Sequence, residues 1–258
     1  MALVNVSTGN EPCIIKVSVK SKSGLVTLRL IAFDSYQTET VFTDRIKDIK
    51  SSFDFYIRLP QSASVTDVIV YDIDTDNETF VITEVSKMPF EKVISPLFDL
   101  SFSQKEFLKF SQQFAYNAVV LKNGQYESDG GRFKIQYYDN LYNEDGSAAM
   151  TSFRISIDSG TIQASRHYVR NYTLPVIFFL LWHEYSHVYM NKEVDNELEA
   201  DLNAIEVYLG LGYPYVDLLT ALAVTFDSNR TQENESRWKY CKDYIDNYFE
   251  ENSNYKNL

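Results

Sequence analysis

The sequence predicts an α+β protein in two parts: an N-terminal all-β sandwich-like domain (1–86) and a C-terminal domain (103–258) with a small sheet and helices. A linker (87–102) joins them. Between residues 13 and 85, hydrophobic and polar residues alternate with a period of two, which is typical of strands. Beyond residue 102, hydrophobic residues recur every three or four positions, the spacing of amphipathic helices.

The alternation in the N-terminal part is clearest in two stretches, 26–32 and 53–59. Further strands are expected at 14–19, 65–72 and 79–85, with turn-prone residues between them. Five or six short strands without an intervening helix favour a small β-sandwich. Its acidic residues have no catalytic spacing. We therefore expect this domain to dock the chain onto a partner, such as a larger protein assembly.

The domain boundary is predicted by Pro89 and Pro96, which interrupt a stretch without a sustained period. After it, the hydrophobic spacing predicts a helix over 103–121 and two strands over 132–138 and 151–157.

The apolar run 174–182 predicts a buried helix, because hydrophobic residues occupy every side of it. Asn171 or Thr173 can cap its start, and Pro175 is tolerated in the first turn. Three more helices are expected, over 196–209, 214–226 and 232–249.

The run 174–182 ends in the motif His183-Glu184-x-x-His187. Residues four apart share one face of a helix, so both imidazoles can reach the same metal ion. Glu184, one step round the helix, can reach a water molecule at that metal. The chain has three histidines, and two of them lie in this motif. The pattern predicts the site of a zinc hydrolase.

Glu197 is the expected third ligand, because a second helix that folds back after the turn-like residues 191–193 brings its carboxylate to the histidines. Two histidines and one carboxylate leave a fourth position open, as in catalytic zinc sites. Asp201 lies on the same helix face and is expected to accept the spare N–H of a ligating histidine. Glu193 and Glu199 are the competing candidates for third ligand.

With these residues the chain resembles the gluzincin metallopeptidases, in which an E-x-x-A-D or E-x-x-A-N block follows H-E-x-x-H. Here the block is Glu197-Leu198-Glu199-Ala200-Asp201. Similar motif pairs occur in membrane prenyl-protein endopeptidases and in small soluble peptidases, some of them phage-encoded, that cleave regulators. The resemblance covers the layout from residue 102 to 249, although the connection between the two motifs is shorter than in many relatives.

The resemblance implies that residues 103–258 form a zincin-like metallopeptidase domain. His183, His187 and Glu197 would bind Zn²⁺, and Glu184 would act as the general base in the hydrolysis of a protein or peptide substrate. It also implies that the strand before the active-site helix lies at the edge of the cleft. There an extended peptide can add to the sheet by main-chain hydrogen bonds.

A non-catalytic role is the alternative: a structural or assembly component of a phage particle that retains the zincin-like fold. The sandwich-like domain is of a kind used in assembly or docking. Glu184 favours catalysis, because a purely structural zinc site has no use for a general base.

Four other residues are candidates for supporting roles. His167, Tyr213 and Tyr215 could each donate a hydrogen bond to an oxyanion, and His167 could equally cap local structure. Arg237 occupies a late helix, where related peptidases often keep a basic residue that braces the site. An exposed salt bridge is the other role for such an arginine.

Charge and composition exclude several classes of function. The net charge of −12 argues against binding to nucleic acid, which requires a basic surface. The run 174–182 is about half of the ~20 apolar residues that cross a bilayer, so no membrane span is expected. Cys13 and Cys241 are expected to be reduced and partly buried, and residues 1–5 lack the features of a secretion signal. We therefore expect the chain in the bacterial or host-cell cytoplasm, or in the virion.

Overall fold

The computed structural model describes the chain except for residues 23, 91–99, 228–230 and 252–258. The described residues form eleven strands in three sheets and six helices, a mixed α+β fold. Two compact units cluster by their contacts: Met1–Val93 with Gly212–Pro214, and Ile94–Leu211 with Tyr215–Asn257. Most of the expected linker 87–102 lies outside the described residues.

The first unit consists of seven strands in two antiparallel sheets. The strands are β1 (Ala2–Ser7), β2 (Cys13–Ser21), β3 (Val26–Asp34), β4 (Val41–Ile49), β5 (Ser52–Leu59), β6 (Val65–Asp72) and β7 (Phe80–Pro89). One sheet has the order β1-β6-β3-β4, and the other has the order β5-β2-β7. Neither β1 nor β4 was among the expected strands, and β7 continues beyond the expected end at residue 85.

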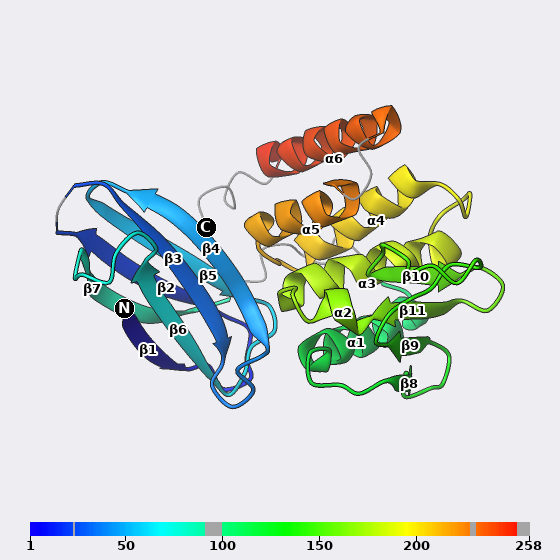
Figure 1. Ribbon diagram of the computed structural model, residues 1–258, viewed down its shortest axis with the longest axis horizontal. Coiled ribbons are helices and arrows are strands. Elements are labelled where there is room, and N and C mark those ends of the chain that lie inside the picture. The colour runs from blue at the N-terminus through cyan, green and yellow to red at the C-terminus, as the bar shows by residue number, and fades with distance from the viewer. Residues whose placement is uncertain (23, 91–99, 228–230, 252–258) are drawn as a thin grey trace. The chain divides into compact units, whose positions relative to one another are not determined.

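The core of the first unit follows from the alternation in its strands. On β3, Val26, Leu28, Leu30 and Ala32 are all buried, and the residues between them are partly exposed. β2 is the middle strand of the three-stranded sheet, and it is buried over most of its length on both faces. Figure 1 shows these strands in blue to cyan.

The second unit contains a four-stranded sheet and all six helices. Its elements are α1 (Phe102–Asn117), β8 (Gly124–Glu127), β9 (Lys134–Tyr138), β10 (Phe153–Ser156), β11 (Thr161–Ser165), α2 (Arg166–Val169), α3 (Leu174–Tyr189), α4 (Glu197–Gly210), α5 (Tyr215–Asp227) and α6 (Gln232–Glu251). The sheet order is β10-β11-β9-β8, in which only β11 and β9 are parallel. β10 is therefore an edge strand. Strands β8 and β11 and helix α2 were not expected.

Helix α3 is the centre of this unit, as its uniformly apolar sequence predicts. Every residue from Leu174 to His183 is buried. The helix packs against α1, α4, α5, β10 and β11, and Figure 1 shows it between the green strands and the yellow and orange helices. A metal site on such a helix has a rigid support.

An aromatic cluster fixes α1 and the sheet against α3. The rings of Phe107 and Tyr185 stack with centroids 4.1 Å apart, and Trp182 and Phe133 meet Phe107 edge-on. The indole N–H of Trp182 donates to the hydroxyl of Ser111 at 3.1 Å, so its polar atom is satisfied in the core.

Local residues set the ends of the two helices that carry the motifs. Thr173 is at the N-cap of α3, and Pro175 lies in the first turn. The Thr173 hydroxyl donates to the Asp217 carboxylate instead of capping the helix. Asn196 caps α4 by accepting from the Glu199 backbone N–H at 2.9 Å. Gly212, with φ +79°, has the left-handed conformation that glycine adopts without strain. The helix expected over 103–121 ends at Asn117.

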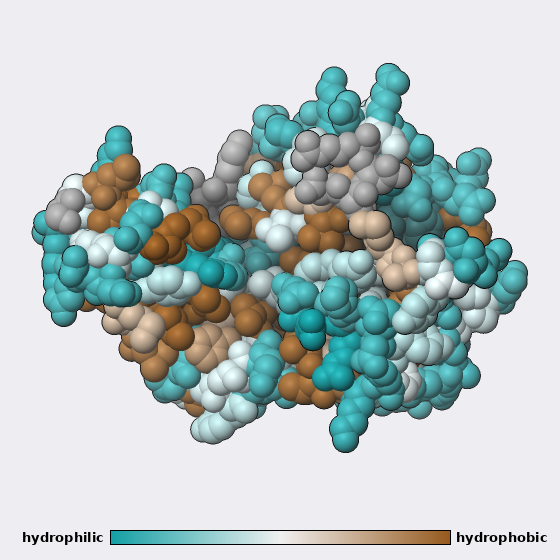
Figure 2. All heavy atoms as spheres, viewed as in Figure 1, coloured by the Kyte–Doolittle hydropathy of each residue, from teal (hydrophilic) through white to brown (hydrophobic). Residues whose placement is uncertain are grey.

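Cys13 and Cys241 are both free and buried. No helix in the described ranges is long and apolar enough to cross a membrane. Hydrophilic residues cover much of the face seen in Figure 2, with hydrophobic residues interspersed.

Candidate metal centre

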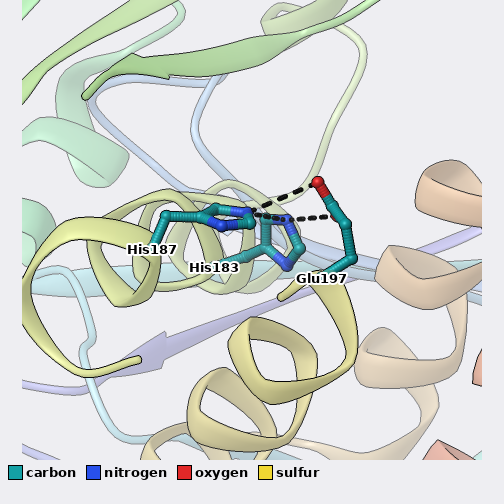
Figure 3. Close-up of side chains that lie close together, drawn as sticks. All are labelled: His183, His187 and Glu197. Atoms are coloured by element: carbon teal, nitrogen blue, oxygen red, sulfur yellow. Dashed lines mark hydrogen bonds and ion pairs between the residues drawn. The ribbon is translucent and has the colours of Figure 1, made fainter. Parts of the chain in front are cut away.

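His183, His187 and Glu197 form a cluster that could bind a metal ion. One potential ligand atom from each residue lies within 4.8 Å of the other two. The two histidines project from consecutive turns of α3, and Glu197 is the first residue of α4. Figure 3 shows the Glu197 carboxylate facing the ring nitrogens.

The spacing of these atoms suits a tetrahedral ion. The Nε2 atoms of His183 and His187 are 3.2 Å apart, and the Glu197 oxygens lie 3.4 and 3.6 Å from them. Ligand atoms held about 2.0–2.1 Å from a tetrahedral zinc ion are about 3.4 Å from one another. The three side chains therefore fit one small cation with little rearrangement.

The oxygen atoms that each Nδ1 contacts decide which ring nitrogen is available for a metal. Nδ1 of His187 lies 2.7 Å from the carbonyl oxygen of Val194, which can only accept, so Nδ1 must carry a proton. Nδ1 of His183 likewise lies 2.9 Å from a carboxylate oxygen of Asp201. In the neutral rings, both Nε2 lone pairs then point into the same space as the Glu197 carboxylate. Such a convergence of acceptors requires a cation or a proton.

Asp201 and Arg237 contact each other and the residues of the cluster. Asp201 is fully buried, and Arg237 donates to its other oxygen through Nε at 3.0 Å and through a terminal nitrogen at 2.7 Å. The same terminal nitrogen of Arg237 lies 3.1 Å from Glu197. The Arg237 guanidinium therefore contacts both the potential ligand Glu197 and Asp201, which in turn contacts the potential ligand His183. The Arg237 side chain is only 11% exposed, so its ion pair is not the exposed surface pair that was the other option.

These contacts shift the pKa values of the cluster in opposite directions. Burial alone would lower the pKa of His183, but hydrogen bonds with Asp201 and Glu197 outweigh it and raise the pKa to about 10. The hydrogen bond with His183 lowers the pKa of Glu197 to about 2, although burial opposes this.

Glu184 lies next to this cluster and lines a cleft. Burial by the surrounding atoms raises the pKa of its carboxyl group to about 7, while the backbone N–H of Ile155 hydrogen-bonds to it and opposes the shift. Ile155 belongs to the edge strand β10, so the carboxylate is held between the metal cluster and the open edge of the sheet.

The cleft has a volume of about 750 Å³, within the usual range for ligand sites. The cluster residues and Glu184 line its floor. Its walls come from the segment around β10, from α2 and from the facing parts of α5 and α6.

The other candidates lie elsewhere. His167, Tyr213 and Tyr215 are not among the described residues that line the cleft. The exposed ring of His167 packs edge-on against Tyr168, Tyr213 is buried, and Tyr215 packs against Phe249. The described cluster does not include the competing carboxylates Glu193 and Glu199.

Comparison with protein-family models, with curated proteins and with solved structures gave no match to this chain. The donor set and its geometry therefore carry the interpretation of the site.

Proposed function

We propose that the chain is a zinc-dependent metallopeptidase whose metal ligands are His183, His187 and Glu197. The observation that carries the proposal is the pair of outward Nδ1 contacts with acceptor oxygens, which leaves both Nε2 lone pairs facing the Glu197 carboxylate. Two imidazoles and one carboxylate are the donors of many catalytic zinc sites, which keep a fourth position open. The gluzincin-like order of the two motifs supports the same assignment.

Zn²⁺ would supply Lewis acidity that lowers the pKa of a water molecule toward ~7 and polarises a carbonyl group. Glu184 then has the role of general base. Its carboxylate takes one proton from the attacking water and passes it to the leaving nitrogen. The water oxygen forms a bond to the carbonyl carbon, the C–N bond breaks, and the products are a carboxylate and an amine.

A peptide is the substrate class that this surface suits best. β10 has β11 on one side and no strand on the other among the described residues. An extended peptide can pair with such an edge through main-chain hydrogen bonds. Because Ile155 on β10 contacts Glu184, a paired peptide would bring one of its bonds beside the base.

The experiment combines metal analysis with two substitutions. Purified protein should contain about one zinc per chain, and His187→Ala should lose it. Glu184→Gln preserves shape and removes the base, so it should keep zinc and lose cleavage of a peptide library, read by mass spectrometry. Glu233→Gln is the matched control, because Glu233 is an exposed carboxylate that lines the same cleft.

The outcomes separate the possibilities. Retention of zinc by His187→Ala would remove the proposed ligand set. Equal cleavage by the wild type and Glu184→Gln would remove the proposed base. Zinc without cleavage of any peptide would instead favour the structural or assembly role.

A further inference from the structure

Two arginines line the cleft, and they differ in their partners. Arg237 forms ion pairs with Asp201 and Glu197, so its charge is balanced by the protein itself. Arg154, on the edge strand β10, donates through Nε to the side-chain oxygen of Gln163 at 2.7 Å. Gln163 is neutral, and among the described residues no carboxylate forms an ion pair with Arg154. The terminal N–H donors of this partly exposed guanidinium are therefore available to a ligand.

Arg154 stands at the end of a polar row that crosses the four-stranded sheet. In the register of the sheet, Arg154 is opposite Gln163, Gln163 is opposite Gln136, and Gln136 is opposite Gln125 (Figure 1). The Gln163 amide donates to the side-chain oxygen of Gln136 at 3.2 Å, so hydrogen bonds continue from one strand to the next. The adjacent row, on the opposite face of the sheet, is buried at Phe153, Ala164 and Tyr137. The polar row therefore ends in a cation at the free edge.

A peptide that pairs with the free edge of β10 would add one more member to this row. Residues opposite each other on neighbouring strands project from the same face of a sheet. The backbone N–H of Ile155 bonds to Glu184, so it points away from β11, and the N–H of Arg154 points toward β11. In an antiparallel pair, the peptide residue opposite Arg154 would then be a non-hydrogen-bonded neighbour, about 4.5 Å away between Cα atoms. In this arrangement the facing side chains are closest.

We propose that Arg154 determines specificity by binding an acidic side chain of the substrate, at the peptide position opposite it on β10. This inference rests on the proposed peptidase function. A carboxylate there would accept hydrogen bonds from the terminal nitrogens of the guanidinium and balance its charge. A lysine there would place a like charge opposite Arg154, which destabilises a strand pair. Asp195 and Glu233 line the same cleft from other segments, so the preference for an acid is confined to this one position.

The test uses the full-length, zinc-loaded Glu184→Gln protein and short fluorescent peptides that carry glutamate, glutamine or lysine at one central position. Binding is measured by fluorescence polarisation. The glutamate peptide should bind about threefold to fivefold more tightly than the glutamine peptide, the range of a partly exposed ion pair across strands, and the lysine peptide should bind most weakly. Arg154→Gln, added to the same background, should abolish the preference for glutamate, and Arg154→Glu should make the lysine peptide the tightest. Arg170→Gln removes the same charge at an exposed residue that is not among the described residues lining the cleft, and it should keep the original order.

Cleavage by the wild type gives the register, because moving the glutamate along the peptide should move the broken bond with it. The proposal is overturned if the three peptides bind equally or not at all, if Arg154→Glu keeps the original order, or if Arg170→Gln loses it. Cleavage that occurs without any preference for glutamate would leave the peptidase function in place and refute the role of Arg154. If Arg154→Glu reverses the order of binding but the wild type cleaves no peptide, hydrolysis is refuted and Arg154 remains a binding residue for acidic chains.

Discussion

Replacing Asp201 by asparagine tests whether the buried carboxylate sets the affinity of the metal site. The substitution keeps the size of the side chain and removes its charge. The oxygen 2.9 Å from His183 Nδ1 would no longer be anionic, so the ring would be a weaker ligand and its orientation would be less fixed. Changes at such partners of a metal-bound histidine weaken metal binding about 10–100-fold. This corresponds to about 1.4–2.7 kcal/mol.

The same substitution also costs stability, because Arg237 loses one of its partners. Breaking a buried ion pair costs about 3–5 kcal/mol. Arg237 still has Glu197 at 3.1 Å and Asn234 at 3.3 Å, so the low end, about 3 kcal/mol, applies. Domains are stable by about 5–15 kcal/mol, so the variant should remain folded and its zinc affinity can be measured.

The assay is a titration of zinc against a competing chelator, with circular dichroism to confirm folding. Glu199→Gln is the control, since it removes a carboxylate from the same helix that contacts the Lys192 backbone rather than a histidine. Asp201→Asn should bind zinc at least about tenfold more weakly than this control. If the two variants bind zinc equally well, Asp201 does not support the ligand.

Two further predictions concern stability. Burial raises the pKa of Glu206, so the folded state holds that proton more tightly than the unfolded state. Stability then falls as pH rises above the unfolded value of 4.5, and Glu206→Gln should raise the melting temperature at pH 7 but not at pH 4; a lower melting temperature at pH 7 would contradict this. Phe107→Ala removes the ring stacked on Tyr185 and should cost about 3–5 kcal/mol in urea denaturation. Phe102→Ala, where the ring is 80% exposed, should change stability by less than about 0.5 kcal/mol. Equal losses for the two phenylalanines would refute the role of the aromatic cluster.

The five longer helices and the central strands of the first unit, β2, β3 and β6, could be predicted because their burial is one-sided or complete. The apolar run 174–182 has no polar face, so it could only be a buried helix. β3 alternates, so its inner face was visible in the sequence.

The missed strands have weaker signals for physical reasons. β4 carries Asp44, Arg45, Lys47 and Asp48, the charged composition of an edge strand that is protected from pairing with another chain. β8 is four residues long, lies at the other end of its sheet from β10, and has no buried side chain. Such strands are defined by their neighbours more than by their own hydrophobicity.

The sequence predicted the grouping of the candidate site where local spacing controls it. His183 and His187 are one helical turn apart, and Glu197 and Asp201 are one turn apart on the next helix. Arg237 follows Asp201 by 36 residues, so no helical spacing could connect them. The acceptor for His187 is a backbone carbonyl, that of Val194, and every residue has such a group. Arg237 was a candidate through the resemblance alone, and the partners in both contacts depend on the fold.

The connection between the two motif helices, residues 190–196, is held by side-chain hydrogen bonds. The Asn191 side-chain amide donates to the carbonyl of Asn196 at 2.8 Å, and Asn203 in turn donates to Asn191 at 3.0 Å. These bonds and the packing of α3 against α4 hold Glu197 opposite the histidines. His187→Ala leaves these bonds in place, so loss of zinc from this variant should leave the circular dichroism spectrum unchanged.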